Sequence, residues 1–118
     1  TSGGRSWLDP AVRSAFVSMP AGPGRPLGWD RPEREGKEPS SFGSLTSDAT
    51  FGHTGWTGTQ VWMDPVHDVF VVLLTNRAYL PAHKDTMQRM RLVRARVADA
   101  AVEAVAPCAR YASRGGSC

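Results

Sequence analysis

The chain has 118 residues, of which 41% are apolar and 21% charged, so it has the size of one small domain and is too apolar for a disordered protein. Its formal charge is +3, and without a basic cluster on a recognised motif this balance does not indicate a nucleic-acid partner. No apolar run reaches the roughly 18 residues of a membrane span. The N-terminus has neither an initiator methionine nor a signal-peptide core, so we expect a piece of a longer protein.

The first predicted element is a short helix from Pro10 to about Met19. Asp9 can accept hydrogen bonds from the free N–H groups of the first turn, and proline at the first helical position needs no acceptor. Apolar residues recur at helical spacing until Pro20 and Gly22, which are expected to end the helix.

Residues 20–50 are rich in proline, glycine, serine and charge, and we expect them to lie on the surface or to border a site. One island, Leu27-Gly28-Trp29-Asp30, could form a short strand. Trp29 could line the rim of a site, but packing in the core is the favoured role.

Residues 58–64 and 68–75 are predicted to form an antiparallel hairpin. The first strand stops at Asp64-Pro65, and the second contains an unbroken apolar run over residues 69–74. Two strands joined by so short a turn must pair antiparallel. The unbroken run is typical of a central strand covered on both faces, and Trp62 is expected to pack against a helix.

A helix over residues 85–105 is predicted to cover this sheet. Asp85 and Gln88 have the spacing of a capping box. The apolar residues expected on one side share the helical period: Met87, Met90, Val93, Val97, Ala101, Ala104 and Val105. Four arginines scatter around the remainder and are expected to be solvated: Arg89, Arg91, Arg94 and Arg96.

The cysteines and histidines do not form a metal site. His53, His67 and His83 lack the spacing of a zinc site, so neither a metal nor another cofactor is expected, and the last two are most simply solvated. Cys108 and Cys118 lie in a loose tail over residues 107–118, where they could close a small loop or remain free thiols.

The segment that carries chemistry is 52–59, which reads Gly-His-Thr-Gly-Trp-Thr-Gly-Thr. Glycine is costly in a strand because it loses the most backbone entropy and packs nothing, so three in seven positions indicate a close approach of a ligand or another backbone. The plainer interpretation is a glycine-rich turn that enters the hairpin, with His53 on the surface.

The order of several segments resembles the serine β-lactamases, penicillin-binding proteins and related esterases. This family carries a Lys-Thr-Gly triplet on the strand beside its active site, and many esterase-like members replace the lysine by histidine, as in His53-Thr54-Gly55. A Leu-Gly-Trp element precedes the triplet, and an apolar strand ending in Leu-Thr-Asn-Arg follows it. The resemblance implies an α+β chain that is the C-terminal part of the β-lactamase/transpeptidase-like fold, an antiparallel sheet segment with a covering C-terminal helix.

The resemblance also implies roles for four residues. His53 and Trp56 would be catalytic, since the Trp56 backbone N–H would donate to the developing oxyanion and His53 would donate to a substrate carboxylate or the active-site hydroxyls. Thr54 and Gly55 would bind substrate, because Thr54 would bond the same ligand and Gly55 would leave room for the acyl group. Histidine, unlike lysine, is mostly neutral near pH 7, which favours neutral esters or amides over anionic β-lactams.

The rest of the family's machinery is not in this sequence. The nucleophile is the serine of Ser-x-x-Lys, with a Tyr-x-Asn or Ser-x-Asn motif further on, and neither occurs here. The family places both before the triplet, so we expect an inactive fragment of an enzyme that hydrolyses an ester, amide or β-lactam through an acyl-serine. The alternative is a non-catalytic binding or regulatory member of the same fold.

The resemblance sets the remaining expectations. Residues 1–106 are assigned to the β-lactamase-related domain and residues 107–118 to a flexible tail. The expected partners are a small-molecule substrate and the missing N-terminal part of the same polypeptide, with no nucleic acid and no metal. A periplasmic or secreted location is favoured by the family alone.

Overall fold

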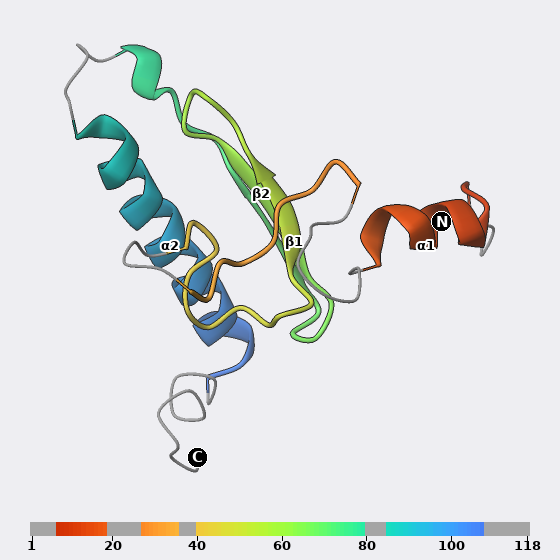
Figure 1. Cartoon of the computed structure of the whole chain (residues 1–118). Coiled ribbons are helices and arrows are strands. Elements are labelled where there is room, and N and C mark those ends of the chain that lie inside the picture. The colour runs from red at the N-terminus through yellow and green to blue at the C-terminus, as the bar shows by residue number, and fades with distance from the viewer. Residues whose placement is uncertain (1–6, 19–26, 36–39, 80–84, 108–118) are drawn as a thin grey trace.

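The computed structural model describes residues 7–18, 27–35, 40–79 and 85–107. Its elements in chain order are α1 (Pro10–Val17), β1 (Phe51–Thr54), β2 (Gln60–Asp64), β3 (Val69–Leu73), the 3-10 helix η1 (Arg77–Tyr79) and α2 (Thr86–Val105). The strands form an antiparallel sheet in the order β1-β2-β3, and α2 runs along one face of it (Figure 1). The predicted α+β class and the antiparallel hairpin are confirmed, although both hairpin strands are shorter than expected.

The central strand is β2, and it pairs with both neighbours around Trp62. Trp62 lies opposite Gly52 in β1 and opposite Val71 in β3. A Cβ atom at Gly52 would lie 2.6 Å from the Trp62 Cβ and 2.8 Å from the Phe42 ring. Glycine is therefore required at this point of β1, because two aromatic side chains already fill the space.

The hydrophobic core lies between the sheet and α2. Its buried members are Phe42, Leu45, Trp62, Ala98 and Val102. Trp62 has no exposed surface and belongs to the same cluster as two residues of α2, which confirms its predicted packing against a helix. Replacing such a side chain by alanine typically costs about 3–5 kcal/mol of unfolding free energy.

The predicted inner face of α2 is wrong by about one residue of rotation. The buried residues of this helix are Arg94, Ala95, Ala98 and Val102. Val93 is 44% exposed and Met87 is 53% exposed, although both were expected to face the sheet. Met90, Val97 and Ala101 are half-buried at the flanks of the true face. Small alanines let the helix backbone come close to Trp62, and a pattern of large apolar residues does not reveal that preference.

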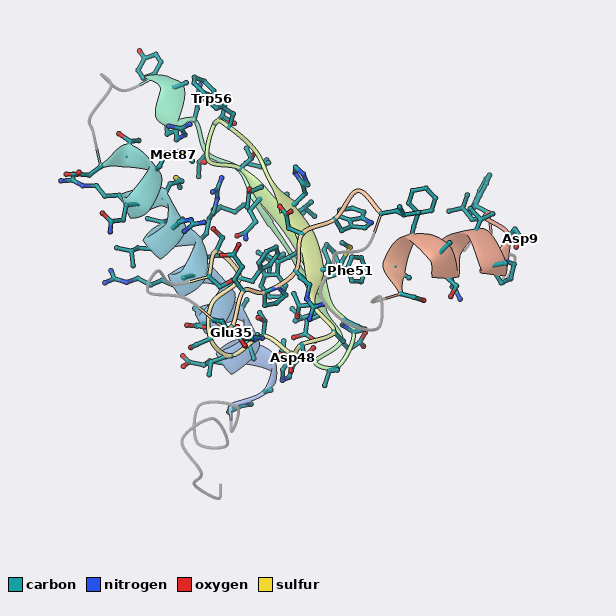
Figure 2. The ribbon with its side chains drawn as sticks, viewed as in Figure 1. Asp9, Glu35, Asp48, Phe51, Trp56 and Met87 are labelled. Carbon is teal, nitrogen blue, oxygen red and sulfur yellow. The ribbon has the colours of Figure 1, made fainter. Side chains whose placement is uncertain are left out.

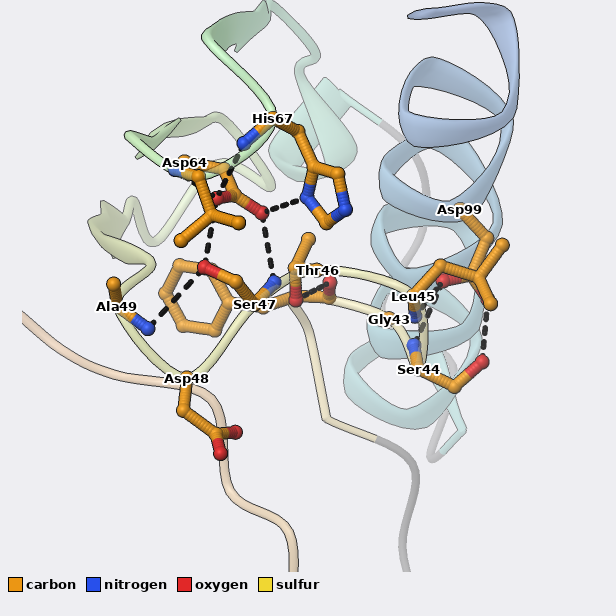
Figure 3. A network of polar contacts seen from close by, with 12 residues as sticks. Gly43, Ser44, Leu45, Thr46, Ser47, Asp48, Ala49, Asp64, His67 and Asp99 are labelled. Carbon is orange, nitrogen blue, oxygen red and sulfur yellow. Dashed lines mark hydrogen bonds and ion pairs between the residues drawn. The ribbon is translucent and has the colours of Figure 1, made fainter. Parts of the chain in front are cut away.

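The loop before β1 is part of the core, which corrects the expectation of a surface segment. Its buried residues are Ser40, Phe42, Leu45, Thr46 and Thr50. The Asp99 carboxylate of α2 fixes the loop by accepting from the backbone N–H of Ser44 at 2.7 Å and of Leu45 at 2.9 Å (Figure 3). Gly43 adopts a φ of +73°, which turns the chain beside this carboxylate.

The helix ends were predicted with mixed success. Asp9 caps α1 as expected, with Oδ1 accepting from the Ala11 N–H at 2.7 Å, and the helix ends at Val17 with Ser18 as its C-cap. Asp85 is the N-cap of α2, but its side chain makes no capping hydrogen bond, so the predicted capping box is not formed. None of the described helices is long and apolar enough to cross a membrane. Several predicted features fall outside the described residues: Met19, Pro20, Gly22, His83, Cys108, Cys118 and most of the tail.

The prediction that residues 69–74 form a strand covered on both faces is wrong for the described part of the chain. β3 lies at the edge of the sheet and alternates between half-buried and exposed residues. Val69 and Val71 pack on the core, whereas Phe70 and Leu74 point away from it and are 71% and 80% exposed. The apolar character of the second face therefore remains on the surface.

This exposed face predicts that the chain by itself is only marginally stable and self-associates. Replacing Phe70 and Leu74 by serine should shift sedimentation-velocity profiles toward the monomer, because an apolar edge strand is a template for association. Val66→Ser is the matched control, since Val66 is 67% exposed but lies in the turn between the strands. A monomeric wild-type chain with a sharp two-state transition would contradict this prediction.

Candidate functional site

β1 carries the His-Thr-Gly triplet to one corner of the sheet. The strand ends at Thr54, with His53 exposed and Thr54 half-buried. Along its outer edge, the backbone bonds that the structure describes join Gly52 to Asp30, at 2.7 and 3.0 Å. The predicted strand over residues 27–30 is reduced to this single bridge. His53 pairs with Val61 of β2 on the inner side, but on the outer edge, past the bridge, no described strand pairs with β1, so a ligand could approach there.

Trp29 supports β1 from the side. Its ring meets that of Phe51 edge-on, with the centroids 5.6 Å apart and the planes at 68°. Both residues are half-buried. The contact favours the packing role for Trp29 over a place on the rim of a site.

Directly after the triplet, residues 55–59 form a tight loop between β1 and β2. The Gly55 N–H donates to the Thr59 carbonyl at 2.8 Å, and the Gly58 N–H donates to the Gly55 carbonyl at 3.0 Å. Gly58 has a φ of +98°, and a Cβ atom there would lie 2.7 Å from the Met90 sulfur. A Cβ atom at Gly55 would collide with the Thr59 hydroxyl. The tight turn therefore requires glycine at these two positions, whether or not a substrate binds nearby.

Trp56 lies at the tip of this loop, close to η1 (Figure 2). Its side chain is 72% exposed. Its N–H donates no hydrogen bond to any residue that the structure describes. That N–H is therefore available as a donor at the corner where His53 and Thr54 also lie.

Two arginines that the sequence did not single out hold this loop. Arg94, expected to be solvated, is only 3% exposed and donates to three loop carbonyls at 2.8–3.0 Å. Arg77 donates from its backbone N–H to the Thr57 carbonyl at 2.8 Å and from Nε to the Trp56 carbonyl. Its guanidinium carbon lies 4.8 Å from the centroid of the Trp56 ring. The apolar pattern of the helix gave no signal for Arg94, because its burial follows from the covered face around Ala98, one turn further on, which that pattern did not indicate.

An apolar hollow of about 270 Å³ borders the triplet on the sheet face turned away from the core. It extends from His53, Thr54 and Gly55 across Val61 to Val72 and Leu74. The predicted binding residues Thr54 and Gly55 are therefore brought together with His53, while the Trp56 side chain does not line the hollow. A weakly polar group could bind against this surface, with the His53 imidazole as its polar partner.

Ser47, Asp64 and His67 form a second cluster at the opposite end of β2. The buried Asp64 carboxylate accepts from the Ser47 hydroxyl and backbone N–H, both at 2.7 Å, and lies 2.7 Å from His67 Nδ1 (Figure 3). The prediction of a solvated His67 is therefore wrong, because its side chain is only 19% exposed. The Ser47 hydroxyl donates its hydrogen bond to the carboxylate and not to an imidazole. Ser47 is therefore not an activated nucleophile.

These contacts change the acidity of Asp64. Burial raises its pKa, but the hydrogen bonds from the backbone and side chains of Ser47 and His67 outweigh that effect and hold the pKa well below its ordinary value. The charged carboxylate thereby fixes the loop before β1 to the end of β2. In the described residues, no group of three or more His, Cys, Asp or Glu side chains could hold a metal ion.

Comparison with known proteins places this geometry in a family. The family model described as Beta-lactamase matches residues 5–95, which include the triplet, the loop and the hairpin. The chain belongs to the beta-lactamase family. No solved structure gives a significant match.

Curated relatives of this beta-lactamase family chain bear one name in several bacteria. A protein named "Putative D-alanyl-D-alanine carboxypeptidase" from Escherichia coli (strain K12) is 44% identical over 55 residues, which is 47% of this chain and 12% of that protein. Proteins of the same name from Salmonella newport and Salmonella agona are 46% identical over the same length, with the same shares of both chains. The matched region thus spans only about an eighth of these relatives.

The lowered pKa of Asp64 predicts an acid-sensitive fold. The pKa of Asp64 is lower in the folded state than in the unfolded state. The charged carboxylate therefore stabilises the fold at pH values above the ordinary aspartate pKa of about 3.9, and this contribution is lost as the pH falls below that value. Asp64→Asn should lower the stability at pH 7 by about 1.5–3 kcal/mol, and this disadvantage should become progressively smaller as the pH falls from about 4 to 2.

Thermal unfolding between pH 2 and 7, followed by tryptophan fluorescence, measures this difference. Asp68→Asn is the matched control in the same turn, because Asp68 is exposed and the positive φ of 51° at this position is tolerated by asparagine. A difference between wild type and Asp64→Asn that stays constant down to pH 2 would contradict the prediction.

Proposed function

We propose that this chain is the C-terminal part of a serine hydrolase that cleaves an ester, amide or β-lactam bond through an acyl-serine intermediate. Membership of the beta-lactamase family supports the reaction type. The nucleophilic serine and its lysine would come from the part of the protein that precedes this sequence, since no Ser-x-x-Lys occurs here. The chain alone would then be inactive.

The observation that carries this proposal is the free N–H of Trp56 at the open corner of the sheet. The carbonyls of the loop accept hydrogen bonds from within the protein, whereas this N–H has no acceptor among the described residues. A backbone donor that is fixed in place and unpaired before the reaction can stabilise the oxyanion of a tetrahedral intermediate, and removing such a donor costs about 2.7–4 kcal/mol.

His53 and Thr54 would orient the substrate beside this donor. His53 is exposed and borders the apolar hollow, so its imidazole can hydrogen-bond a group that rests there. Thr54 lines the same hollow and would bond the same ligand. Neutral esters or amides remain the favoured substrates, and the name of the curated relatives makes the amide of a peptide one candidate.

The missing N-terminal part of the polypeptide is the proposed partner of the exposed face of β3. Phe70, Val72 and Leu74 are each more than half exposed on one side of this strand. Covering them would remove apolar surface from water at about 25 cal/mol per Å². We also propose, from the family resemblance alone, that the β-lactamase-related domain ends at residue 106 and that the protein is periplasmic or secreted.

The second candidate is a non-catalytic binding member of the same family. It would use the same hollow and the same corner of the sheet without an acyl-enzyme. The absence of Ser-x-x-Lys from these 118 residues leaves this function open. The sequence that precedes the chain decides, because the motif would be present in an enzyme and absent in a binding protein.

Substitution of His53 in the full-length protein tests the proposed hydrolase. His53→Ala should lower kcat/KM for a neutral ester by about ten- to hundred-fold, because removing one partner of a hydrogen bond and leaving the other unsatisfied costs about 1–3 kcal/mol. The reaction should not be abolished, since His53 is not the nucleophile. Steady-state kinetics on a neutral ester and on a β-lactam measure both parts.

His53→Lys completes the test. The lysine ammonium stays charged at neutral pH and should recover part of the activity, with a shift toward substrates that bear a carboxylate. Val66→Ala, in the exposed turn far from the triplet, is the control for effects of mutagenesis alone. Unchanged kinetics in His53→Ala with a native circular dichroism spectrum would leave His53 as an ordinary surface histidine.

A further inference from the structure

Arg94 is a buried cation that binds backbone oxygens of the loop. Its Nε donates to the Gly58 carbonyl at 3.0 Å, while one terminal nitrogen donates to the carbonyls of Gly55 at 2.8 Å and Thr59 at 3.0 Å. Within the described part of the chain, no carboxylate pairs with this guanidinium. The loop carbonyls therefore supply the compensation that a buried charge requires.

These hydrogen bonds hold the loop in place as well as the arginine. Burial and the charges of Arg77 and Arg91 lower the pKa of Arg94, so the guanidinium is stabilised only while the three carbonyls stay in place. The carbonyl of Gly55 and the N–H of Trp56 belong to the same peptide unit, which is planar. A hydrogen bond that fixes the direction of that carbonyl also fixes the direction of the Trp56 N–H.

The planar guanidinium is suited to this role in a way that lysine is not. It reaches carbonyls at both ends of the loop, Gly55 on one side and Gly58 with Thr59 on the other. A lysine ammonium is a compact point charge without this forked geometry. The thioether of Met90 lies close to Gly58 and leaves little room for the loop to shift toward a shorter side chain.

We propose that Arg94 is a positioning residue for acyl transfer, which aims the Trp56 N–H at the oxyanion by holding the peptide unit between Gly55 and Trp56. The inference rests on the proposed function of that N–H. Arg94 touches neither the substrate nor the reacting atoms. It acts from α2, 39 residues along the chain from the carbonyl that it holds.

Kinetics of the full-length protein with Arg94→Lys test this role. A misplaced donor weakens binding of the transition state more than that of the substrate, so kcat should fall about ten- to hundred-fold with KM changed by less than about three-fold. In Arg94→Ala, added guanidinium chloride at millimolar concentration should restore part of kcat with saturation. Arg96→Lys is the matched control, because Arg96 is exposed on the same helix.

Amide hydrogen exchange supplies a readout that does not depend on activity. In Arg94→Lys, the N–H groups of Gly55 and Gly58 should exchange roughly ten-fold faster, while those of the β2–β3 ladder keep their rates. Unchanged exchange in the loop, or a variant that loses stability with wild-type kcat, would overturn the inference. A wild-type protein with no hydrolase activity would instead overturn the proposed function, and with it the kinetic half of the inference, while the exchange rates still decide whether Arg94 holds the loop.

Discussion

The packing of Trp62 against the small residues of α2 is the contact on which the rest of the structure depends. Trp62 has no exposed surface, and Ala98 and Val102 in the same cluster are equally buried. An aromatic ring that large can be covered by a helix only where the helix presents small side chains. The contact therefore sets both the distance of α2 from the sheet and its rotation about its own axis.

The rotation of α2 has a direct consequence for the candidate site. Arg94 lies one turn before Ala98, so a helix that turns Ala98 to the sheet also turns Arg94 to it. The guanidinium then meets the carbonyls of the loop after the His-Thr-Gly triplet. Five residues beyond Arg94, on the other flank of the covered face, the Asp99 carboxylate holds the loop over residues 44 and 45. A single helix face thus supports the core, the loop of the candidate site and the segment that precedes β1.

The two charged groups buried near the ends of β2 are stabilised in the same way. Arg94 is surrounded by carbonyl oxygens, and Asp64 is surrounded by N–H and O–H donors. Each charge is compensated mainly by backbone groups or short polar side chains of nearby turns. Such compensation requires a loop that is fixed in place. The loop over residues 55–59 and the turn after Asp64 therefore make many hydrogen bonds, although neither is part of a strand.

The amino-acid sequence by itself determined the features that depend on neighbouring residues. The hairpin around Asp64-Pro65, the cap at Asp9 and the helix after Asp85 follow from local periods and turn residues. The family is indicated by short motifs in a fixed order: Leu-Gly-Trp, then His53-Thr54-Gly55, then Leu-Thr-Asn-Arg. Only the tertiary structure decided that Arg94 is buried, that His67 bonds Asp64 and that the apolar run of β3 leaves one face exposed. These outcomes depend on which surface of a helix or strand meets another part of the chain. Periodicity shows that a helix or strand is amphipathic, but contacts between residues far apart in the chain decide which side is covered and which polar group finds a partner.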